Sequence, residues 1–305
     1  MSRTDVALVT CASLIGKPDP DDVILRELLV ARGTSVAIVA WDDPGFEWAS
    51  ARFALLRSTW DYFRRYDEFL AWIDRAGKAT TLCNPPDVVR WNSHKGYLVE
   101  LAAKGLPVVA TELVKKGTRP DLDRLLVERA WKKVVLKPAV SGGSHRTLLG
   151  DAANLPEARA HLAAIVADGD ALVQPYMSVV EGYGERSMVF LDGELTHAIR
   201  KRPAFGSKSS GVAEAFVPGT PLLENADVDP AVPAEDEIDT ARRILEGAGK
   251  RDLLYARVDL VRQLDGMPVL MELELVEPSL FLWHGGAKAK DRLADGIIRR
   301  LSPSP

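Results

Sequence analysis

Residues 270–279 read LMELELVEPS and carry two glutamates two positions apart in a run that is otherwise apolar. Side chains two positions apart in a strand point to the same face, so Glu272 and Glu274 share one face while the neighbouring leucines face a core. Two adjacent carboxylates repel each other and are costly to bury unless a cation neutralises them. The segment predicts either a solvated strand face or a metal-binding wall.

A second strand with a carboxylate precedes this segment. Residues 255–261 read YARVDLV, and a turn, LDG at 264–266, joins them to the glutamate strand. In an antiparallel pair, Asp259 lies beside Glu272 and Glu274 if the polar faces match in register. Three carboxylates on one sheet face suit Mg²⁺, which commonly binds one or two carboxylates together with nucleotide phosphates. The strand pair therefore favours the metal-binding interpretation.

A lysine and a glycine-rich loop occur together in residues 135–145, VLKPAVSGGSH. Lys137 supplies positive charge, and glycines let backbone N–H groups approach phosphate oxygens closely. The segment matches neither the GxxxxGK[ST] nor the GxGxxG pattern. An ordinary turn also remains open for this loop. The loop comprises Ser141, Gly142, Gly143 and Ser144.

The composition is that of an ordinary globular protein, with 305 residues, 47% hydrophobic and 27% charged, which favours two or three subdomains. A net charge of −4 and a pI near 5.8 argue against a nucleic-acid partner. The sequence has no apolar run of about 18 residues and no signal-peptide h-region. Cys11 and Cys83 match no metal spacing, so we expect buried free thiols. These features predict a cytoplasmic protein with a small-molecule substrate and no membrane partner, and leave a homodimer open.

Strands and helices alternate along the first 90 residues, which predicts a small doubly wound α/β domain. Its expected strands are 5–11, 35–41, 51–58 and 79–86, and its expected helices are 21–32 and 66–77. The rest predicts α+β units, with residues 203–211 as a mobile loop. The expected helices there are 92–104, 119–131, 155–167, 233–247 and 287–301. The expected strands there are 132–140, 171–177, 185–191, 194–202, 212–217, 253–262 and 268–276.

Together these segments resemble the ATP-grasp superfamily over about residues 91–290. The family's metal-binding pattern is Asp, then Glu-x-Asn; Asp259 and Glu272 match it, and Glu274 stands where asparagine is usual. The resemblance implies ATP and Mg²⁺ as cofactors, with two ions at these three residues and Mn²⁺ as an alternative ion. It also implies an ATP-grasp fold of mixed α/β and α+β class behind an N-terminal doubly wound, pre-ATP-grasp domain. The expected division is 1–90 for the substrate domain, 91–175 for the small subdomain and 176–305 for the large one.

The resemblance also implies a nucleotide site. Lys95 in WNSHKGYL and Lys137 match the family's two nucleotide-binding lysines. The segment LVQPYM resembles the hinge whose backbone contacts adenine. Its expected contact residues are Gln174, Tyr176 and Met177, and the ribose ligand is either Glu181 or Glu185.

Three cations take catalytic roles by the same resemblance. Arg257 occupies the position that in amino-acid ligases stabilises the acyl-phosphate and the tetrahedral species. Arg200 and Lys201, in HAIRKRP, are candidates for contacts with the γ-phosphate.

The acceptor site is expected at the end of the third strand, where open α/β sheets bind ligands. The segment RSTWDY comprises Arg57, Ser58, Thr59, Trp60, Asp61 and Tyr62. Arg57 can pair with a substrate carboxylate and Asp61 with an ammonium group. The alternative is a helix start that Ser58 or Thr59 caps while Trp60 packs.

The resemblance implies an ADP-forming ligase that activates a carboxylate of a small amino-acid-like substrate as an acyl-phosphate, which an amine or related nucleophile attacks. The nearest branch is glutathione-synthetase-like and includes cyclo-ligases that form the D-cycloserine ring from a ureido-serine precursor. Two alternatives remain open. One is an ATP-grasp small-molecule kinase, and the other is a non-catalytic nucleotide-binding protein on the same fold.

Overall fold

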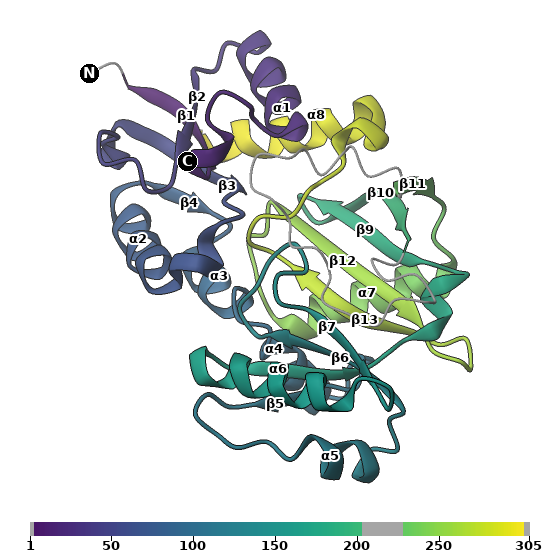
Figure 1. Cartoon of the computed structure of the whole chain (residues 1–305). Helices are drawn as coiled ribbons and strands as arrows, with labels where there is room; N and C mark the ends of the chain where they lie inside the picture. The colour runs from purple at the N-terminus through teal and green to yellow at the C-terminus, as the bar shows by residue number, and fades with distance from the viewer. Residues whose placement is uncertain (1–2, 203–227, 302–305) are drawn as a thin grey trace.

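The computed structural model describes residues 3–202 and 228–301 and arranges them around three sheets (Figure 1). The expected loop at 203–211 and the expected strand at 212–217 lie outside the described residues. Within them, no helix is long and apolar enough to cross a membrane. Each sheet belongs to a different part of the chain, and the candidate site lies on the third.

The first sheet is parallel and has the strand order β2-β1-β3-β4. Alternate residues of β1 and β3 are buried against opposite layers, as expected for a parallel sheet covered on both faces. Helices α1 and α8 cover one face and α2 covers the other. Its elements are β1 (Thr4–Thr10), α1 (Pro20–Ala31), β2 (Val36–Ala40), β3 (Ala51–Ser58), α2 (Tyr66–Ala79) and β4 (Thr81–Cys83), with 3₁₀ turns at Ala12–Leu14, Trp48–Ser50 and Tyr62–Arg65.

The second sheet is antiparallel, has the order β5-β8-β6-β7, and packs against α6. Two short helices, α3 (Pro86–Asn92) and α4 (Tyr97–Ala103), lead into it. Its own elements are β5 (Glu112–Val114), α5 (Leu122–Glu128), β6 (Lys133–Pro138), β7 (Leu148–Asp151), α6 (Leu155–Asp168) and β8 (Ala171–Pro175).

The third sheet is antiparallel and has the order β11-β10-β9-β12-β13. One face packs on α4 and α7 through residues such as Val258 and Leu273, which leaves the alternate residues on the other face for the candidate site. Its elements are a 3₁₀ turn (Ser178–Glu181), β9 (Glu185–Leu191), β10 (Glu194–Lys201), β11 (Val228–Ala231), α7 (Glu235–Ala248), β12 (Tyr255–Arg262) and β13 (Pro268–Glu274).

The last helix, α8 (Leu282–Leu301), returns to the first sheet and lies beside α1 in Figure 1. Gly286 interrupts it with φ 66° and ψ −169°, so the expected helix at 287–301 is the part after this kink. Leu293 and Ile297 pack with Leu25 and Leu29 of α1. The described part of the chain thus starts with a strand of the first sheet and ends with a helix that covers that sheet.

Two expected helices differ from the structure. The helix expected at 92–104 begins only at Tyr97 of α4, because the chain before it is not helical and the backbone N–H of Lys95 there donates to Ala139 O at 2.7 Å. The helix expected at 119–131 is shorter because Asp121 caps it by accepting from Arg124 N at 3.0 Å, and Ala130 has a positive φ of 52°. Strands β7 and β11 and helix α3 were not expected from the sequence.

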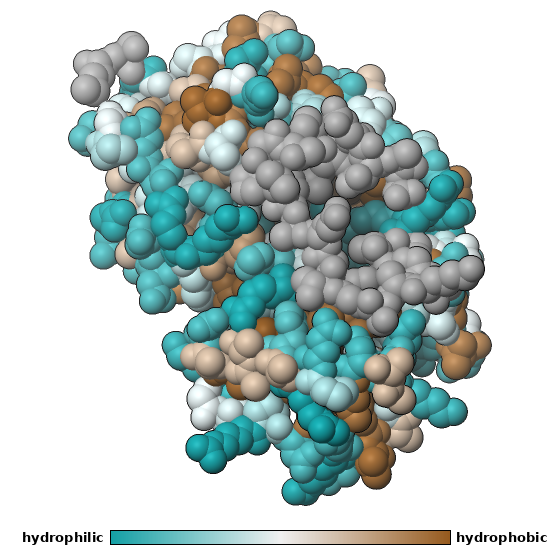
Figure 2. Space-filling model, viewed as in Figure 1, coloured by the Kyte–Doolittle hydropathy of each residue, from teal (hydrophilic) through white to brown (hydrophobic). Residues whose placement is uncertain are grey.

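The surface drawn in Figure 2 alternates between hydrophilic and hydrophobic areas, apart from what the grey atoms cover. Large exposed apolar side chains in the described part of the chain are scattered among separate elements: Ile15, Val30, Val127, Val232, Leu264 and Met267. The two cysteines are buried and free, as expected. Scattered apolar residues of this kind are normal for a protein surface.

Candidate active site

Strands β12 and β13 bring the three expected carboxylates onto one face. Asp259 pairs with Glu272, and Arg257 pairs with Glu274, which is the register that the sequence argument required. Strand β9 lies on the other side of β12 and places Ser187 opposite Asp259. Because side chains alternate along a strand, the acidic residues face away from the leucines that pack on α4 and α7.

The outer edge of β13 is satisfied by side chains instead of another long strand. Asn92 donates to Leu273 O at 2.8 Å and accepts from Leu275 N at 2.7 Å. The Tyr97 hydroxyl accepts from Leu273 N at 2.9 Å. These bonds give partners to buried backbone groups at an edge strand. The sequence did not predict these contacts of Asn92 and Tyr97, although the two residues flank Lys95 on α3 and α4.

Two lysines contact Glu272: Lys137 lies in β6 of the second sheet, and Lys95 lies between α3 and α4. Lys137 Nζ lies 2.6 Å from Glu272 Oε1, and Lys95 Nζ lies 3.9 Å from Glu272 Oε2. Lys95 also donates to Ser141 O at 2.9 Å, which ties it to the glycine-rich loop. The break between α3 and α4 therefore places Lys95 between the loop and the carboxylate.

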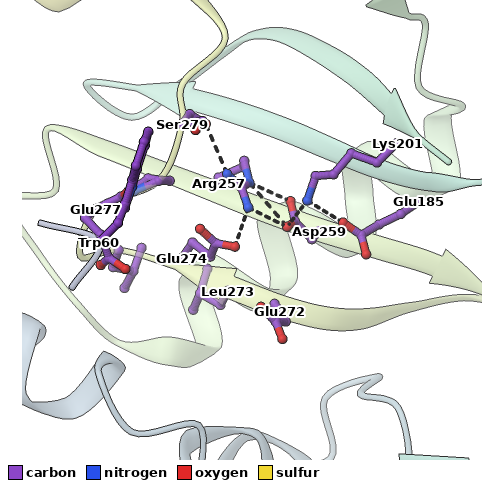
Figure 3. Close-up of polar contacts among 12 residues, drawn as sticks. Trp60, Glu185, Lys201, Arg257, Asp259, Glu272, Leu273, Glu274, Glu277 and Ser279 are labelled. Carbon is purple, nitrogen blue, oxygen red and sulfur yellow. Dashed lines mark hydrogen bonds and ion pairs between the residues drawn. The ribbon is translucent and has the colours of Figure 1, made fainter. Parts of the chain in front are cut away.

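Two further cations hold Asp259, as Figure 3 shows. Arg257 Nε donates to Asp259 Oδ1 at 2.9 Å, and its guanidinium also pairs with Glu274. Lys201 Nζ lies 2.7 Å from Asp259 Oδ2 and bridges to Glu185. The face is thus a network in which cationic side chains offset the buried acids.

The network sets the charge states of the carboxylates. Burial raises the pKa of Glu272, but the charges of Lys137 and Lys95 outweigh it and lower that pKa to about 2. Burial likewise raises the pKa of Asp259, and Arg257 and Lys201 outweigh it, so that this pKa lies well below its usual range. Burial raises the pKa of Glu274, partly offset by Arg257. Two of the three acids are therefore ionised at neutral pH.

The donor set fits a hard divalent cation, because all three side chains offer oxygen atoms on one face. Within residues 3–202 and 228–301, however, no group of three or more His, Cys, Asp or Glu residues is already arranged to hold a metal ion. The physical reason is that Lys137, Lys201 and Arg257 occupy oxygens of the acids.

The other residues predicted to bind the nucleotide lie in two places, some at the expected hinge and one in the acidic network. Gln174 is buried and donates to Thr111 Oγ1 at 2.9 Å. Tyr176 donates its hydroxyl to Glu181 Oε1 at 2.9 Å, just before the 3₁₀ turn that follows Met177. Glu185, by contrast, belongs to the network through Lys201.

Lys201 and Arg200 are adjacent in β10 and therefore point to opposite faces. Lys201 reaches the acidic network, whereas Arg200 lies on the other face of the sheet, and their expected contacts with the γ-phosphate stay predictions. In the glycine-rich loop, Ser144 and Gly143 have positive φ values of 60° and 54°. A turn of this kind can present successive N–H groups to an anion.

The RSTWDY segment differs most from its expected role. Arg57 is 1% exposed, and its Nε lies 3.2 Å from Asp22 Oδ1. Ser58 donates to Asp22 Oδ2 at 2.6 Å, and Thr59 and Tyr62 are also buried. A substrate carboxylate would have to displace a buried acid from Arg57, so this geometry does not favour the expected substrate role, which stays a prediction.

The two remaining residues of that segment also have protein partners. Asp61 accepts from Trp41 Nε1 at 2.8 Å and pairs with Arg65, and its expected role toward a substrate ammonium stays a prediction. Trp60 donates Nε1 to Glu277 O at 3.0 Å and lies beside Glu277 in Figure 3. Trp60 thus contacts the chain just after the glutamate strand.

Comparisons with known proteins agree with this architecture. A family model described as the N-terminal domain of D-cycloserine synthetase DcsG matches residues 6–84. The chain is 32% identical over 303 residues to the cycloserine biosynthesis protein DcsG of Streptomyces lavendulae, covering 98% of this chain and 99% of that protein. The crystal structure of D-cycloserine synthetase DcsG matches with a TM-score of 0.87 at 31% identity, over 97% of this chain and 99% of that one. D-Alanine–D-alanine ligase from Bacillus anthracis complexed with ATP shares the fold, with a TM-score of 0.65 at 15% identity over 99% of this chain and 97% of that one.

Proposed function

Because the chain belongs to the family of the D-cycloserine synthetase DcsG, a family of ATP-grasp ligases, we propose that it closes a ring within a small amino-acid-like substrate. ATP phosphorylates the substrate carboxylate, and a nitrogen of the same molecule attacks the acyl-phosphate and releases inorganic phosphate. A ureido-serine, the precursor type of D-cycloserine, has both groups. The full-length identity to DcsG supports this proposal, because it includes the N-terminal unit as well as the network.

We assign the ATP phosphates to Lys95, Lys137 and the loop Ser141–Ser144. The bond from Lys95 to Ser141 O supports this assignment, since it joins a cation to a loop with exposed N–H groups. Lys137 would exchange its contact with Glu272 for one with a phosphate. Gln174, Tyr176 and Met177 are assigned to the adenine end.

We assign the ribose hydroxyls to Glu181 in preference to Glu185. Glu181 contacts Tyr176 at the adenine end, whereas Glu185 is held by Lys201 inside the network. These two contacts favour Glu181 as the ribose ligand, a choice between the two glutamates that the sequence alone left open.

Asp259, Glu272 and Glu274 would hold Mg²⁺, with two ions and Mn²⁺ as an alternative. When bound, Mg²⁺ supplies positive charge that neutralises the phosphates of ATP. Release of the acids by Lys137 and Lys201 would leave these lysines free to contact phosphate oxygens. The chain's own residues then act by positioning and by electrostatics.

Arg257 is assigned to the acyl-phosphate and to the oxyanion that forms when nitrogen attacks. Its guanidinium is planar, permanently charged and held by Asp259, Glu274 and the carbonyl of Ser279 at 3.1 Å. A donor fixed in this way does not have to reorganise when charge develops in the transition state. No side-chain nucleophile is required.

The single observation that carries the proposal is the paired register of Asp259 with Glu272 beside Lys95 and Lys137. Its test is incubation with ATP, Mg²⁺ and an O-ureido-serine, followed by ADP measurement and mass spectrometry of the product. We expect ADP together with a cyclic product. A stable phosphorylated substrate would indicate a kinase instead, and ATP binding without ADP formation would indicate a non-catalytic protein.

A further inference from the structure

The segment after the glutamate strand, residues 276–282, has side-chain partners for five of its carbonyls and three of its N–H groups; we name it the anchored segment. Five consecutive carbonyls each accept one side-chain hydrogen bond. The donors are Tyr255 Oη to Val276 O (2.7 Å), Trp60 Nε1 to Glu277 O (3.0 Å), Arg57 Nη1 to Pro278 O (3.3 Å), Arg257 Nη1 to Ser279 O (3.1 Å) and His197 Nε2 to Leu280 O (2.8 Å).

The backbone N–H groups at its end are bonded as well. Asp21 accepts from Leu280 N at 2.7 Å, Phe281 N at 2.9 Å and Leu282 N at 2.7 Å. Leu282 begins α8, so one buried carboxylate satisfies orphan donors at that helix start. Five carbonyl groups and the last three N–H groups of the anchored segment therefore have side-chain partners.

Its partners come from two different sheets. Trp60, Arg57 and Asp21 belong to the first unit, whereas Tyr255, Arg257 and His197 belong to the third. Both parts of the chain thus contribute side-chain partners to the segment.

Arg57 is itself constrained. Its Nε lies 3.2 Å from Asp22 Oδ1 and its Nη2 lies 3.7 Å from Asp21 Oδ2. With 1% exposure, the guanidinium has no aqueous alternative to these partners. The Arg57 guanidinium is planar, and two acids hold it in place. It can therefore donate to Pro278 O in one orientation only. The neighbouring carbonyl, Ser279 O, is the one that holds Arg257.

We propose that Arg57 and Trp60 are positioning residues for the ligase reaction, acting through the anchored segment to orient Arg257. They touch no reacting atom. By fixing the carbonyls of Glu277 and Pro278 they fix Ser279 O, which sets the direction of the Arg257 guanidinium. The inference rests on the proposed function, because it assumes that Arg257 acts on the acyl-phosphate.

The test is a double-mutant cycle on kcat. Arg57→Gln is expected to lower kcat about tenfold to a hundredfold, the range for a lost hydrogen bond to a charged group. Trp60→Phe keeps an aromatic ring and is expected to lower kcat about twofold to tenfold. In the background of Arg257→Lys, which removes the forked donor, each is expected to change kcat by less than about twofold. The KM for ATP should remain unchanged, since Lys95 and Lys137 are not altered.

Arg52→Gln is the matched control. Arg52 also lies in β3 and pairs with Asp5 at 2.9 Å, but it has no contact with the anchored segment among those described. It should leave kcat within about twofold in both backgrounds. If Arg57→Gln fails to fold, the Trp60→Phe cycle decides. Losses that multiply with that of Arg257→Lys would overturn the positioning role, whereas an Arg257→Lys enzyme with full kcat would instead overturn the role proposed for Arg257.

Discussion

Glu272 illustrates how one side chain depends on contacts that are distant in sequence. It is paired by register with Asp259, and its carboxylate lies between Lys137 and Lys95. An isolated glutamate on a strand face would be an ordinary solvated acid. The low pKa shows instead a carboxylate whose negative charge two lysines stabilise.

Glu272→Gln removes this charge and keeps the size of the side chain. We expect ADP formation to fall at least about a hundredfold, because charge placed at the phosphoryl group contributes on that scale. The measurement is steady-state ADP release, with circular dichroism to verify the fold. Glu128→Gln, which removes an exposed ion pair with Arg124, serves as the control and should retain parental activity. Turnover at the parental rate in Glu272→Gln would refute the metal assignment.

Lys137→Ala addresses the nucleotide directly. The affinity for ATP is expected to fall about tenfold to a hundredfold, since one charge-assisted phosphate contact contributes roughly 1.5–3 kcal/mol. Calorimetry measures the Kd. Lys104→Ala is the matched control, because that lysine donates to Gly247 O at the surface and should leave ATP affinity intact. Equal ATP affinity in Lys137→Ala and the parent would remove Lys137 from the phosphate site.

At the scale of elements, the N-terminus of α1 gathers three acids beside Arg57. Asp19 caps the helix by accepting from Asp21 N at 2.9 Å. Burial first, and then the charges of Asp22 and Asp21, raise the pKa of Asp19 to about 8. The folded protein therefore binds a proton there that the unfolded chain, with an ordinary pKa of 3.8, releases at lower pH.

The raised pKa of Asp19 makes the stability of the folded protein fall as the pH rises. For a raised acid pKa, the contribution to stability is complete below about pH 3.8 and is lost as the pH rises through about 8. Asp19→Asn remains neutral and can still cap the helix. We expect its free energy of unfolding, relative to the parent, to increase between about pH 5 and about pH 8. Denaturant titrations at several pH values measure it, and parallel pH curves for the two proteins would contradict the assignment.

The sequence predicted those parts of the site that follow from local pattern. The alternation in β12 and β13 and the short turn between them were sufficient to predict that Asp259 lies beside Glu272. The substrate role predicted for Arg57 took no account of its partner Asp22, which lies 35 residues earlier and reads as an ordinary acid in a first helical turn. Likewise, the break before α4 depends on a bond from Lys95 N to Ala139 O, which no local pattern reveals.

In the whole molecule, the first and third sheets are joined at the site by three groups of contacts. Helix α8 packs on the first sheet, and the anchored segment receives donors from both units. Asn84, at the end of β4, donates to both Tyr255 O at 2.9 Å and Leu275 O at 2.8 Å. The first sheet is thus bonded to the strands that carry the acidic network, which suits the proposed reaction because that reaction requires substrate and phosphoryl donor in one fixed geometry.

The proposed ring closure depends on activation of the substrate carboxylate as an acyl-phosphate. The most direct test supplies ATP, Mg²⁺ and an O-ureido-serine whose carboxylate oxygens carry a heavy-oxygen label, and measures the label in the released phosphate by mass spectrometry. Attack of the carboxylate on the γ-phosphorus makes one carboxylate oxygen the bridging atom, and it departs with phosphate when nitrogen attacks the acyl carbon. The acyl-phosphate mechanism therefore predicts one labelled oxygen in the phosphate for each ring formed. Unlabelled phosphate accompanied by ring formation would contradict it.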